Sequence, residues 1–390
     1  MKFKKCLSLL LSVALCITLA ACTTRPAATS DSAQDTTANS ATTTVTTTLD
    51  EPSTATTVSA STTQTTVTTI QKNSTTTTAR ATTTSRTTKA TKPVPTTKRP
   101  TPTIPQQKPT ATPLLYKVTD DQGHVIWLFG SIHVGQSSFY PLPNYVMDAF
   151  NEADSLAVEF DIIAYENDIH EQSRVLSLML HPERDLLPDY IPTEIFDEAY
   201  AILDSYGLYH KDLEFFIPIF WSDIIDSITN ELIGANSDLG IDRHLLNLAY
   251  EKNKTIIDVE SAESQCQMMV DFSDDLQLLL LQSSIIDYYH QDVVKATMKD
   301  MMNIWEKGNE QELEEATEIT YSGSDDNWGY LWEYKRAMVT ERNYKMTNFA
   351  EEALASGGDV FICVGAAHVV GEEGMADLLK ERGYTVEVVR

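Results

Sequence analysis

Apolar residues in the C-terminal part of this 390-residue chain gather into short runs. Four of them have the length and composition of buried strands: 124–130 (HVIWLFG), 155–162 (SLAVEFDI), 359–365 (DVFICVG) and 384–389 (YTVEVV). Between the first two runs and between the last two, residues 143–153 and 372–383 place apolar side chains at helical spacing. Each end therefore predicts a strand, loop, helix and strand, and such units build parallel sheet.

The chain between these two units is mostly helical in pattern. One strand is expected at 255–260 (TIIDVE). Asp242 is expected to be the N-cap of the helix that precedes this strand. The predicted helices are 170–180, 193–206, 219–233, 242–253, 274–290, 292–306, 310–320 and 328–356. We therefore expect an α/β fold with a central mixed or parallel sheet, built from two βαβ halves at the domain ends, and a large helical insertion. A single domain and two tightly joined subdomains both agree with this length.

The N-terminal residues 1–22 have the pattern of a secretory signal peptide. Lys2, Lys4 and Lys5 precede an apolar stretch that closes on LAAC. This ending resembles a bacterial lipobox, which implies cleavage before Cys22 and lipidation of that residue. An ordinary signal peptide or a single membrane anchor are the alternatives. The lipoprotein reading predicts a protein lipid-anchored on the extracytoplasmic face of the cell membrane.

Residues 23–112 read as a linker. They contain 36 threonines and almost no aromatic or large aliphatic side chains, so they cannot form a core that offsets chain entropy. Threonine-rich sequence with proline is typical of a disordered extracellular stalk, glycosylated or bare. The globular part is then 113–390.

The acidic excess of the globular part restricts the classes of partner that it can bind. Residues 113–390 carry 52 acidic and 17 basic side chains, which argues against nucleic-acid binding because that needs a positive surface. Such an excess suits a cationic ligand, a divalent metal or simple solubility. The globular part holds only two cysteines, Cys266 and Cys363, and no paired-cysteine zinc pattern.

A G-x-x-H sequence follows a predicted strand twice. Gly130 ends the run at 124–130 and His133 follows three residues later; Gly365 ends the run at 359–365 and His368 follows three residues later. Open α/β sheets bind ligands at the carboxyl ends of their strands, where both loops are expected. Neutral imidazole binds divalent metals and acts as a general base near neutral pH. We expect the two histidines to share one site; the alternative is a fold repeat in which glycine makes the turn and histidine is incidental.

Acidic and basic partners for such a site are available. Glu159 lies within the predicted strand LAVEFD, where an unpaired charge is costly, and Glu260 ends TIIDVE with Glu263 shortly after it. Two histidines and one carboxylate make a common open metal site. Arg342, followed by Asn343, either pairs structurally with acidic residues or holds a carboxylate or oxyanion.

Six separated segments together resemble the TraB/GumN family: GSIHVG, AVEFD, GIDRHL, VESAESQ, ERNYKM and VGAAHVVGEEGMADLLKERGY. That family is related to the TIKI proteases and, more distantly, to haem-binding ChaN proteins and erythromycin esterases. The resemblance covers 113–390 and implies a metal-dependent peptidase that uses manganese or cobalt, with zinc a further option. It places His133, His368 and Glu159 at the metal. It also implies functional roles, not individually fixed, for Glu260, Glu263, Gln265, Arg342 and Asn343.

Three functions compete. The first is a surface-tethered metallohydrolase acting on a peptide or small molecule, with Glu260 or Glu263 as general base and Arg342 at the oxyanion. The second is a lipoprotein that binds haem, a metal or a peptide without turnover, which needs the histidines but not the other charged residues. The third is a structural or adhesion protein, which the number of motifs disfavours. A serine hydrolase is disfavoured because G-x-S-x-G is absent.

Overall fold

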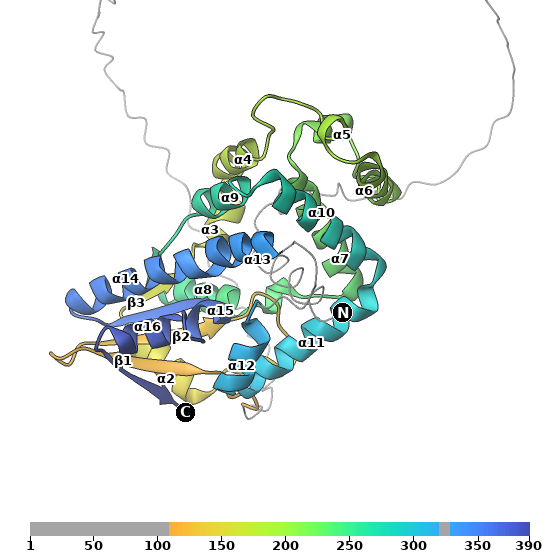
Figure 1. The fold of residues 1–390 in the computed structure, drawn as a ribbon. Coiled ribbons are helices and arrows are strands. Elements are labelled where there is room, and N and C mark those ends of the chain that lie inside the picture. The colour runs from red at the N-terminus through yellow and green to blue at the C-terminus, as the bar shows by residue number, and fades with distance from the viewer. Residues whose placement is uncertain (1–108, 320–327) are drawn as a thin grey trace, which may run out of the picture. The chain divides into compact units, whose positions relative to one another are not determined.

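A computed structural model describes residues 109–319 and 328–390 (Figure 1). The predicted signal peptide, the lipidation site Cys22 and linker residues 23–108 lie outside these residues. The packed part begins slightly before residue 113. Ala111 is buried, and Thr112 donates its backbone N–H to the Glu306 carbonyl oxygen (2.8 Å) and its hydroxyl to the Lys307 carbonyl oxygen (2.9 Å).

A six-stranded mixed sheet forms the centre of the fold, which confirms the predicted fold class. Its order is β4-β3-β5-β2-β1-β6. The first four strands of that order run parallel to one another, and β1 is antiparallel to both β2 and β6. The strands are β1 Leu115–Thr119, β2 Val125–Ser131, β3 Ser155–Val158, β4 Thr255–Asp258, β5 Val360–Gly365 and β6 Thr385–Val389.

The two βαβ halves interleave in this sheet. β5, from the C-terminal half, lies between β2 and β3 of the N-terminal half. Gly130 pairs with Val364, and Ser131 pairs with Gly365. Both G-x-x-H loops therefore leave the same edge of the sheet from adjacent parallel strands.

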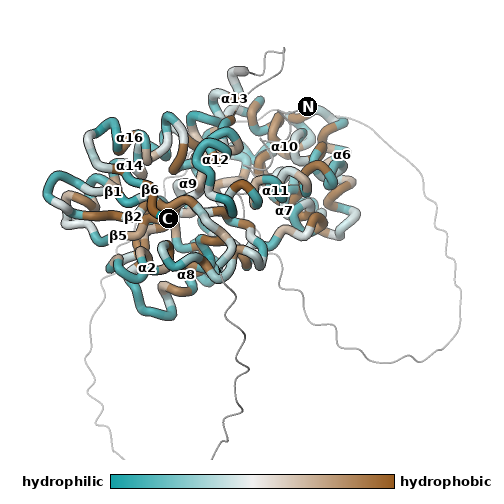
Figure 2. The backbone as a smooth tube through the Cα atoms, turned by 90° about the horizontal axis from the view of Figure 1, so that it is seen from below, coloured by the Kyte–Doolittle hydropathy of each residue, from teal (hydrophilic) through white to brown (hydrophobic). Residues whose placement is uncertain are grey.

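Helices cover both faces of the sheet. Figure 2 shows α14 and α16 on one side of the strands and α2 and α8 on the other. The helices are α2 Asn144–Glu152, α3 Ile162–Asn167, α4 Ile169–Leu178, α5 Leu187–Tyr190, α6 Thr193–Ser205, α7 Pro218–Ile233, α8 Ile241–Lys252, α9 Ala262–Val270, α10 Asp274–Tyr289, α11 Gln291–Lys307, α12 Glu310–Thr317, α13 Trp328–Lys335, α14 Glu341–Ala355, α15 Ala366–Val369 and α16 Met375–Glu381. Short 3₁₀ turns lie at Ser137–Phe139, Lys211–Phe215 and Ser237–Leu239.

The helical insertion has its own apolar core. One buried cluster surrounds the sheet, and a second joins α3–α7, α9, α10 and α13 around Trp221. Both belong to one compact unit of the chain. Among the helices of the described residues, none has the length and apolar character needed to cross a bilayer. Cys266 and Cys363 are both free and buried.

Several local predictions are wrong in an informative way. The expected helix 328–356 is interrupted by a π-helical turn, η4, at Arg336–Thr340. The loop expected after β5 is the short helix α15. Strand β1 was not predicted, because Lys117 and Thr119 interrupt its apolar side chains. The N-cap of α8 is Gly240, so Asp242 lies inside the first turn with its side chain free for another contact.

Candidate functional site

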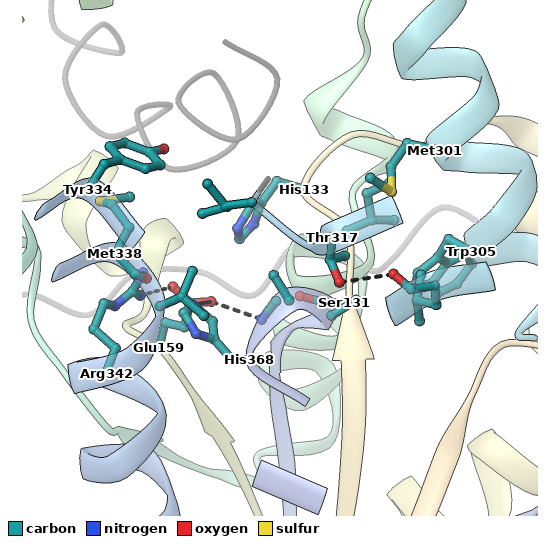
Figure 3. A pocket seen from close by; sticks show the side chains of 17 residues that line it. Ser131, His133, Glu159, Met301, Trp305, Thr317, Tyr334, Met338, Arg342 and His368 are labelled. Atoms are coloured by element: carbon teal, nitrogen blue, oxygen red, sulfur yellow. Dashed lines mark hydrogen bonds and ion pairs between the residues drawn. The ribbon is translucent and has the colours of Figure 1, made fainter. Parts of the chain in front are cut away.

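A pocket lies at the carboxyl ends of β2, β3 and β5 (Figure 3). Its cavity volume is about 90 Å³, several times the space that one water molecule needs. One wall is polar and the other is apolar, with methionine, tryptophan and aliphatic side chains. The lining residues are Ser131, Ile132, His133, Glu159, Met301, Trp305, Leu313, Thr317, Ile319, Tyr334, Met338, Val339, Arg342, Gly365, Ala366, Ala367 and His368.

His368 is held by a neighbouring amide. Asn343 donates its Nδ2 hydrogen to the Glu373 carbonyl oxygen (2.6 Å), so its Oδ1 faces His368 Nδ1 at 2.7 Å and accepts a hydrogen bond from it. The proton is thereby fixed on Nδ1, and the lone pair lies on Nε2, which is 3.9 Å from Glu159 Oε1. Burial, and then the charge of Arg342, lower the pKa of His368 to about 4. The imidazole is therefore neutral near pH 7.

His133 is held by a carboxylate. Its Nδ1 lies 3.0 Å from Oδ1 of Asp242, and its side chain is 23% exposed. Burial opposes protonation, but Asp242 and then Glu159 outweigh it and raise the pKa of His133 to about 9. Gly240 makes this contact possible, because a Cβ there would lie 2.4 Å from the His133 carbonyl oxygen. The Ile241 N–H also donates to the Ile132 carbonyl oxygen (3.0 Å), which places Asp242 beside the histidine.

Glu159 lies just after β3, with both carboxylate oxygens engaged. Oε2 accepts from Arg342 Nη2 (2.6 Å) and Gln265 Nε2 (3.0 Å), and Oε1 accepts from the Gly365 N–H (2.9 Å). A Cβ at Gly365 would lie 3.3 Å from Oε1, so glycine leaves room for this carboxylate. Burial favours the neutral acid, but Arg342 and then His368 and His133 hold the pKa of Glu159 well below its usual range. Gly365 thus shapes the site through Glu159.

Arg342 is buried and shared by two carboxylates. Besides Glu159, it binds Glu260 through Nε (3.0 Å) and Nη2 (2.7 Å), and Nη1 donates to the Met338 carbonyl oxygen (3.3 Å). One of its five N–H groups then lacks a partner among the described residues. Removing the arginine would leave two buried carboxylates unpaired, at a typical cost of about 3–5 kcal/mol. Of the two roles expected for Arg342, the geometry favours structural charge pairing.

Three other predicted residues lie outside the pocket lining. Glu260 is nearly buried and is held by Arg342 and by Gln265 Nε2 (2.9 Å). Glu263 is exposed on α9. Gly130 packs against α15, where a Cβ would lie 3.0 Å from the Ala366 Cα. The structure therefore brings together His133, His368, Glu159, Arg342 and Gly365, with Asn343 and Gln265 directly behind them.

Two residues that matter here were not predicted as site residues. Asp242 stands in the quoted motif GIDRHL, and a polar side chain just after a glycine turn was the available signal. Tyr334 lines the pocket from α13, and nothing in its sequence surroundings distinguishes it from a core tyrosine.

The side chains of the pocket are of the types that bind divalent metals, but the distances between them are not those of a metal site. Each histidine has Nδ1 backed by a polar group, which orients Nε2 as in many metal sites. Glu159 is the only acidic side chain among the described residues that line the pocket. Within residues 109–319 and 328–390, however, no group of three or more His, Cys, Asp or Glu side chains has the spacing of a metal site. The two imidazoles are therefore suited to a metal, whereas the Glu159 carboxylate is bound by Arg342.

Comparison with known proteins places the chain among relatives. Two proteins named uncharacterized protein YbaP, from Escherichia coli (strain K12) and Shigella flexneri, are each 24% identical to it over 255 residues. The matched region is 65% of this chain and 87% of each relative. No solved structure matches the chain significantly. The model of the TraB/PrgY/gumN family matches residues 114–388, so the chain belongs to that family.

Proposed function

We propose that residues 113–390 form a metal-dependent hydrolase, and specifically a peptidase of the TIKI type, that acts on a peptide or another small molecule. The observation that carries the proposal is the matched backing of two histidines in one pocket. His368 Nδ1 lies 2.7 Å from Asn343 Oδ1, and His133 Nδ1 lies 3.0 Å from Asp242 Oδ1. Such backing holds both imidazoles at one pocket. Nε2 of His368 has a free lone pair near pH 7, whereas Nε2 of His133, whose pKa is raised to about 9, would bind a metal only after it loses its proton.

Each residue of the site then has its own role. Nε2 of His133 and of His368 would hold manganese, cobalt or zinc, which when bound polarises the scissile carbonyl and lowers the pKa of water. Glu159 accepts the proton of the attacking water, since it is the acidic side chain among the described residues that line the pocket. Arg342 and Gln265 fix Glu159 in place. The apolar wall excludes water and holds an apolar part of the substrate.

The proposed location is the outer face of the cell membrane. The LAAC ending of the leader supports lipidation of Cys22, and the threonine-rich linker supports a stalk that separates the domain from the bilayer. The substrate would then be an extracytoplasmic molecule that reaches a tethered domain.

A binding lipoprotein without turnover is the second candidate, and one observation favours it. Arg342 and Glu260 were the charged groups expected to separate an enzyme from a binder. In the structure they bind each other, together with Glu159, and so serve the fold as much as any reaction.

The test is metal content together with cleavage. Protein purified without chelator is analysed for bound metal and incubated with a peptide library, with His133→Ala and His368→Ala beside it. Each variant should lose both metal and cleavage, and the double variant should be no worse, because residues acting as a unit are not additive. His170→Ala, exposed on α4, is the matched control. Bound metal without any cleavage would favour the binding lipoprotein.

A further inference from the structure

Two hydroxyl groups in the pocket lining, those of Ser131 and Tyr334, have no hydrogen-bond partner among the described residues. Tyr334 is fully buried, lines the pocket, and its hydroxyl has no hydrogen-bond partner among the described residues. Figure 3 shows its ring on the pocket wall beyond Met338, with the oxygen at the end that faces the cavity. Burying a hydroxyl without a partner costs free energy. A bound ligand that supplies the partner would remove that cost.

The helix that carries Tyr334 directs it to the reacting groups. Tyr334, Met338 and Arg342 follow one another at intervals of four residues, and all three line the pocket. The π-helical turn Arg336–Thr340 lies between the first and the last of them. Such turns occur frequently at functional sites, since they re-aim the side chains around them. Tyr334 and Arg342 are also close enough for the charge of the arginine to affect the pKa of the phenol.

Two other side-chain donors of the lining, on Trp305 and Thr317, are already in use. Trp305 Nε1 donates to the Gly130 carbonyl oxygen (2.8 Å), and Thr317 Oγ1 donates to the Leu313 carbonyl oxygen (2.9 Å). Arg342 is held by its two carboxylates and by the Met338 carbonyl oxygen, with one N–H group left over. Burial, and then Asp226, raise the pKa of the Tyr334 phenol, so it keeps its proton and remains a donor. An oxygen that becomes negative in this pocket would need such a group.

We propose that Tyr334 is a catalytic residue whose hydroxyl donates a hydrogen bond to the carbonyl oxygen of the scissile bond. The inference rests on the proposed hydrolase function. Water adds to the carbonyl carbon, its proton passes to Glu159, and the carbonyl electron pair moves onto the oxygen held by Tyr334. The electron pair on that oxygen re-forms the carbonyl as the carbon–nitrogen bond breaks, and the nitrogen takes the proton from Glu159. A carboxylic acid and an amine leave, and the acid then passes its proton to the amine.

The variant Tyr334→Phe removes only the hydroxyl. Its kcat on the peptide library should fall by about 100- to 1000-fold, the usual loss for one oxyanion donor, with KM nearly unchanged. Its melting temperature should be equal or higher, because an unsatisfied buried group has gone. Tyr330→Phe is the matched control: that residue is on the same helix, and its hydroxyl donates to Asp275 (2.8 Å) away from the pocket. An unchanged kcat, or a loss that only follows a drop in folded protein, would overturn the proposal.

A second measurement separates this inference from the proposed function. A pool of phosphinic dipeptides, whose tetrahedral phosphinate resembles the water adduct of an amide, is titrated against both proteins. Wild-type protein should bind the pool more tightly than Tyr334→Phe. If wild-type protein binds more tightly but cleaves nothing, hydrolysis fails and the donor role stands. Equal binding by both proteins, or no binding by either, overturns the donor role.

Discussion

At the scale of single residues, the groups behind the two histidines decide what their outer nitrogens can do. Asn343 fixes the proton of His368 on Nδ1, and its own orientation is fixed by the Glu373 carbonyl oxygen. Asp242 pairs with His133 from a different part of the chain. Neither partner needs to touch a substrate to matter, since a rotated imidazole would lose the geometry that the proposed metal site requires.

Replacing Asp242 tests whether the group behind His133 controls metal binding. Asp242→Asn keeps the size of the side chain but removes the carboxylate that orients His133, and loss of such a partner typically costs 10- to 100-fold in metal affinity or activity. We expect metal affinity to fall by about that factor. Metal titration with competing chelator measures it. Asp238→Asn, exposed on the preceding 3₁₀ turn, should leave affinity unchanged, and equal affinities for all three proteins would contradict the role of Asp242.

At the scale of elements, helices α7 and α10 bury acidic side chains between them. Asp223 is fully buried with neither carboxylate oxygen bonded within the described part of the chain, and Asp226 follows it by one turn of α7. Burial, and then the neighbouring Asp226, raise the pKa of Asp223 well above its usual range. The helical insertion therefore contains a carboxyl group that favours unfolding once the unfolded chain can ionise it.

The sign of the pH dependence follows. The unfolded carboxyl ionises near pH 4, so above that pH the folded state loses ~1.4 kcal/mol of stability per pH unit through Asp223 until its own pKa is reached. Asp223→Asn cannot ionise, so its stability relative to wild type should rise between pH 4 and pH 7. Denaturant unfolding at several pH values measures the difference. Asp197→Asn, exposed on α6, should show no such trend, and a flat difference for Asp223→Asn would mean the group is ionised when folded.

The sequence pattern predicted where the strands and helices lie better than it predicted which strands pair. The apolar runs and helical spacing placed five of the six strands and most of the long helices within a few residues, because burial alone dictates such patterns. The interleaving of β5 between β2 and β3 was not predictable, since strand pairing depends on contacts between distant segments. The same limit explains Asp242, whose contact with His133 joins two loops that are far apart in sequence. The π-helical turn and Tyr334 left no recognisable pattern.

At the scale of the whole molecule, both ends of the described region are tied to the end of α11. Thr112 donates to carbonyl oxygens of Glu306 and Lys307, and Arg390 Nη1 donates to the Thr112 carbonyl oxygen (2.7 Å). Ala111 is buried nearby. The last residues of the predicted linker are thus part of the folded domain.

Two truncations locate the boundary. A chain starting at residue 109 should unfold at the same temperature as one starting at residue 23, because residues 23–108 contain too few apolar side chains to form a core. A chain starting at residue 113 loses the Thr112 hydrogen bonds, at about 1 kcal/mol each, and should melt several degrees lower. Scanning calorimetry of the three chains decides this. Equal melting temperatures at 109 and 113 would show that the Thr112 contacts contribute nothing.

Attachment to the membrane depends on one residue if the leader is that of a lipoprotein. Cys22→Ser should move the protein from the membrane fraction to the soluble fraction, because a lipidated cysteine is then its anchor. Fractionation after a high-salt wash measures it, with Cys363→Ser, a buried residue of β5, as the control that stays with the membrane. A Cys22→Ser variant that still sediments with membranes would point to an uncleaved leader.

Because β5 lies between β2 and β3, the pocket can form only after β5 has been synthesised. Strand β5 is synthesised after β2, β3 and β4, yet it lies between β2 and β3 in the sheet and brings Gly365 and His368 with it. An incomplete chain lacks the neighbour that both β2 and β3 require, so those strands have no partner at their inner edges. Long-range pairing of this kind is slow to form and comes late in folding. A chain that is still being made, or one cut short before β5, therefore has His133 but lacks the second histidine and the complete sheet, so it lacks the pocket.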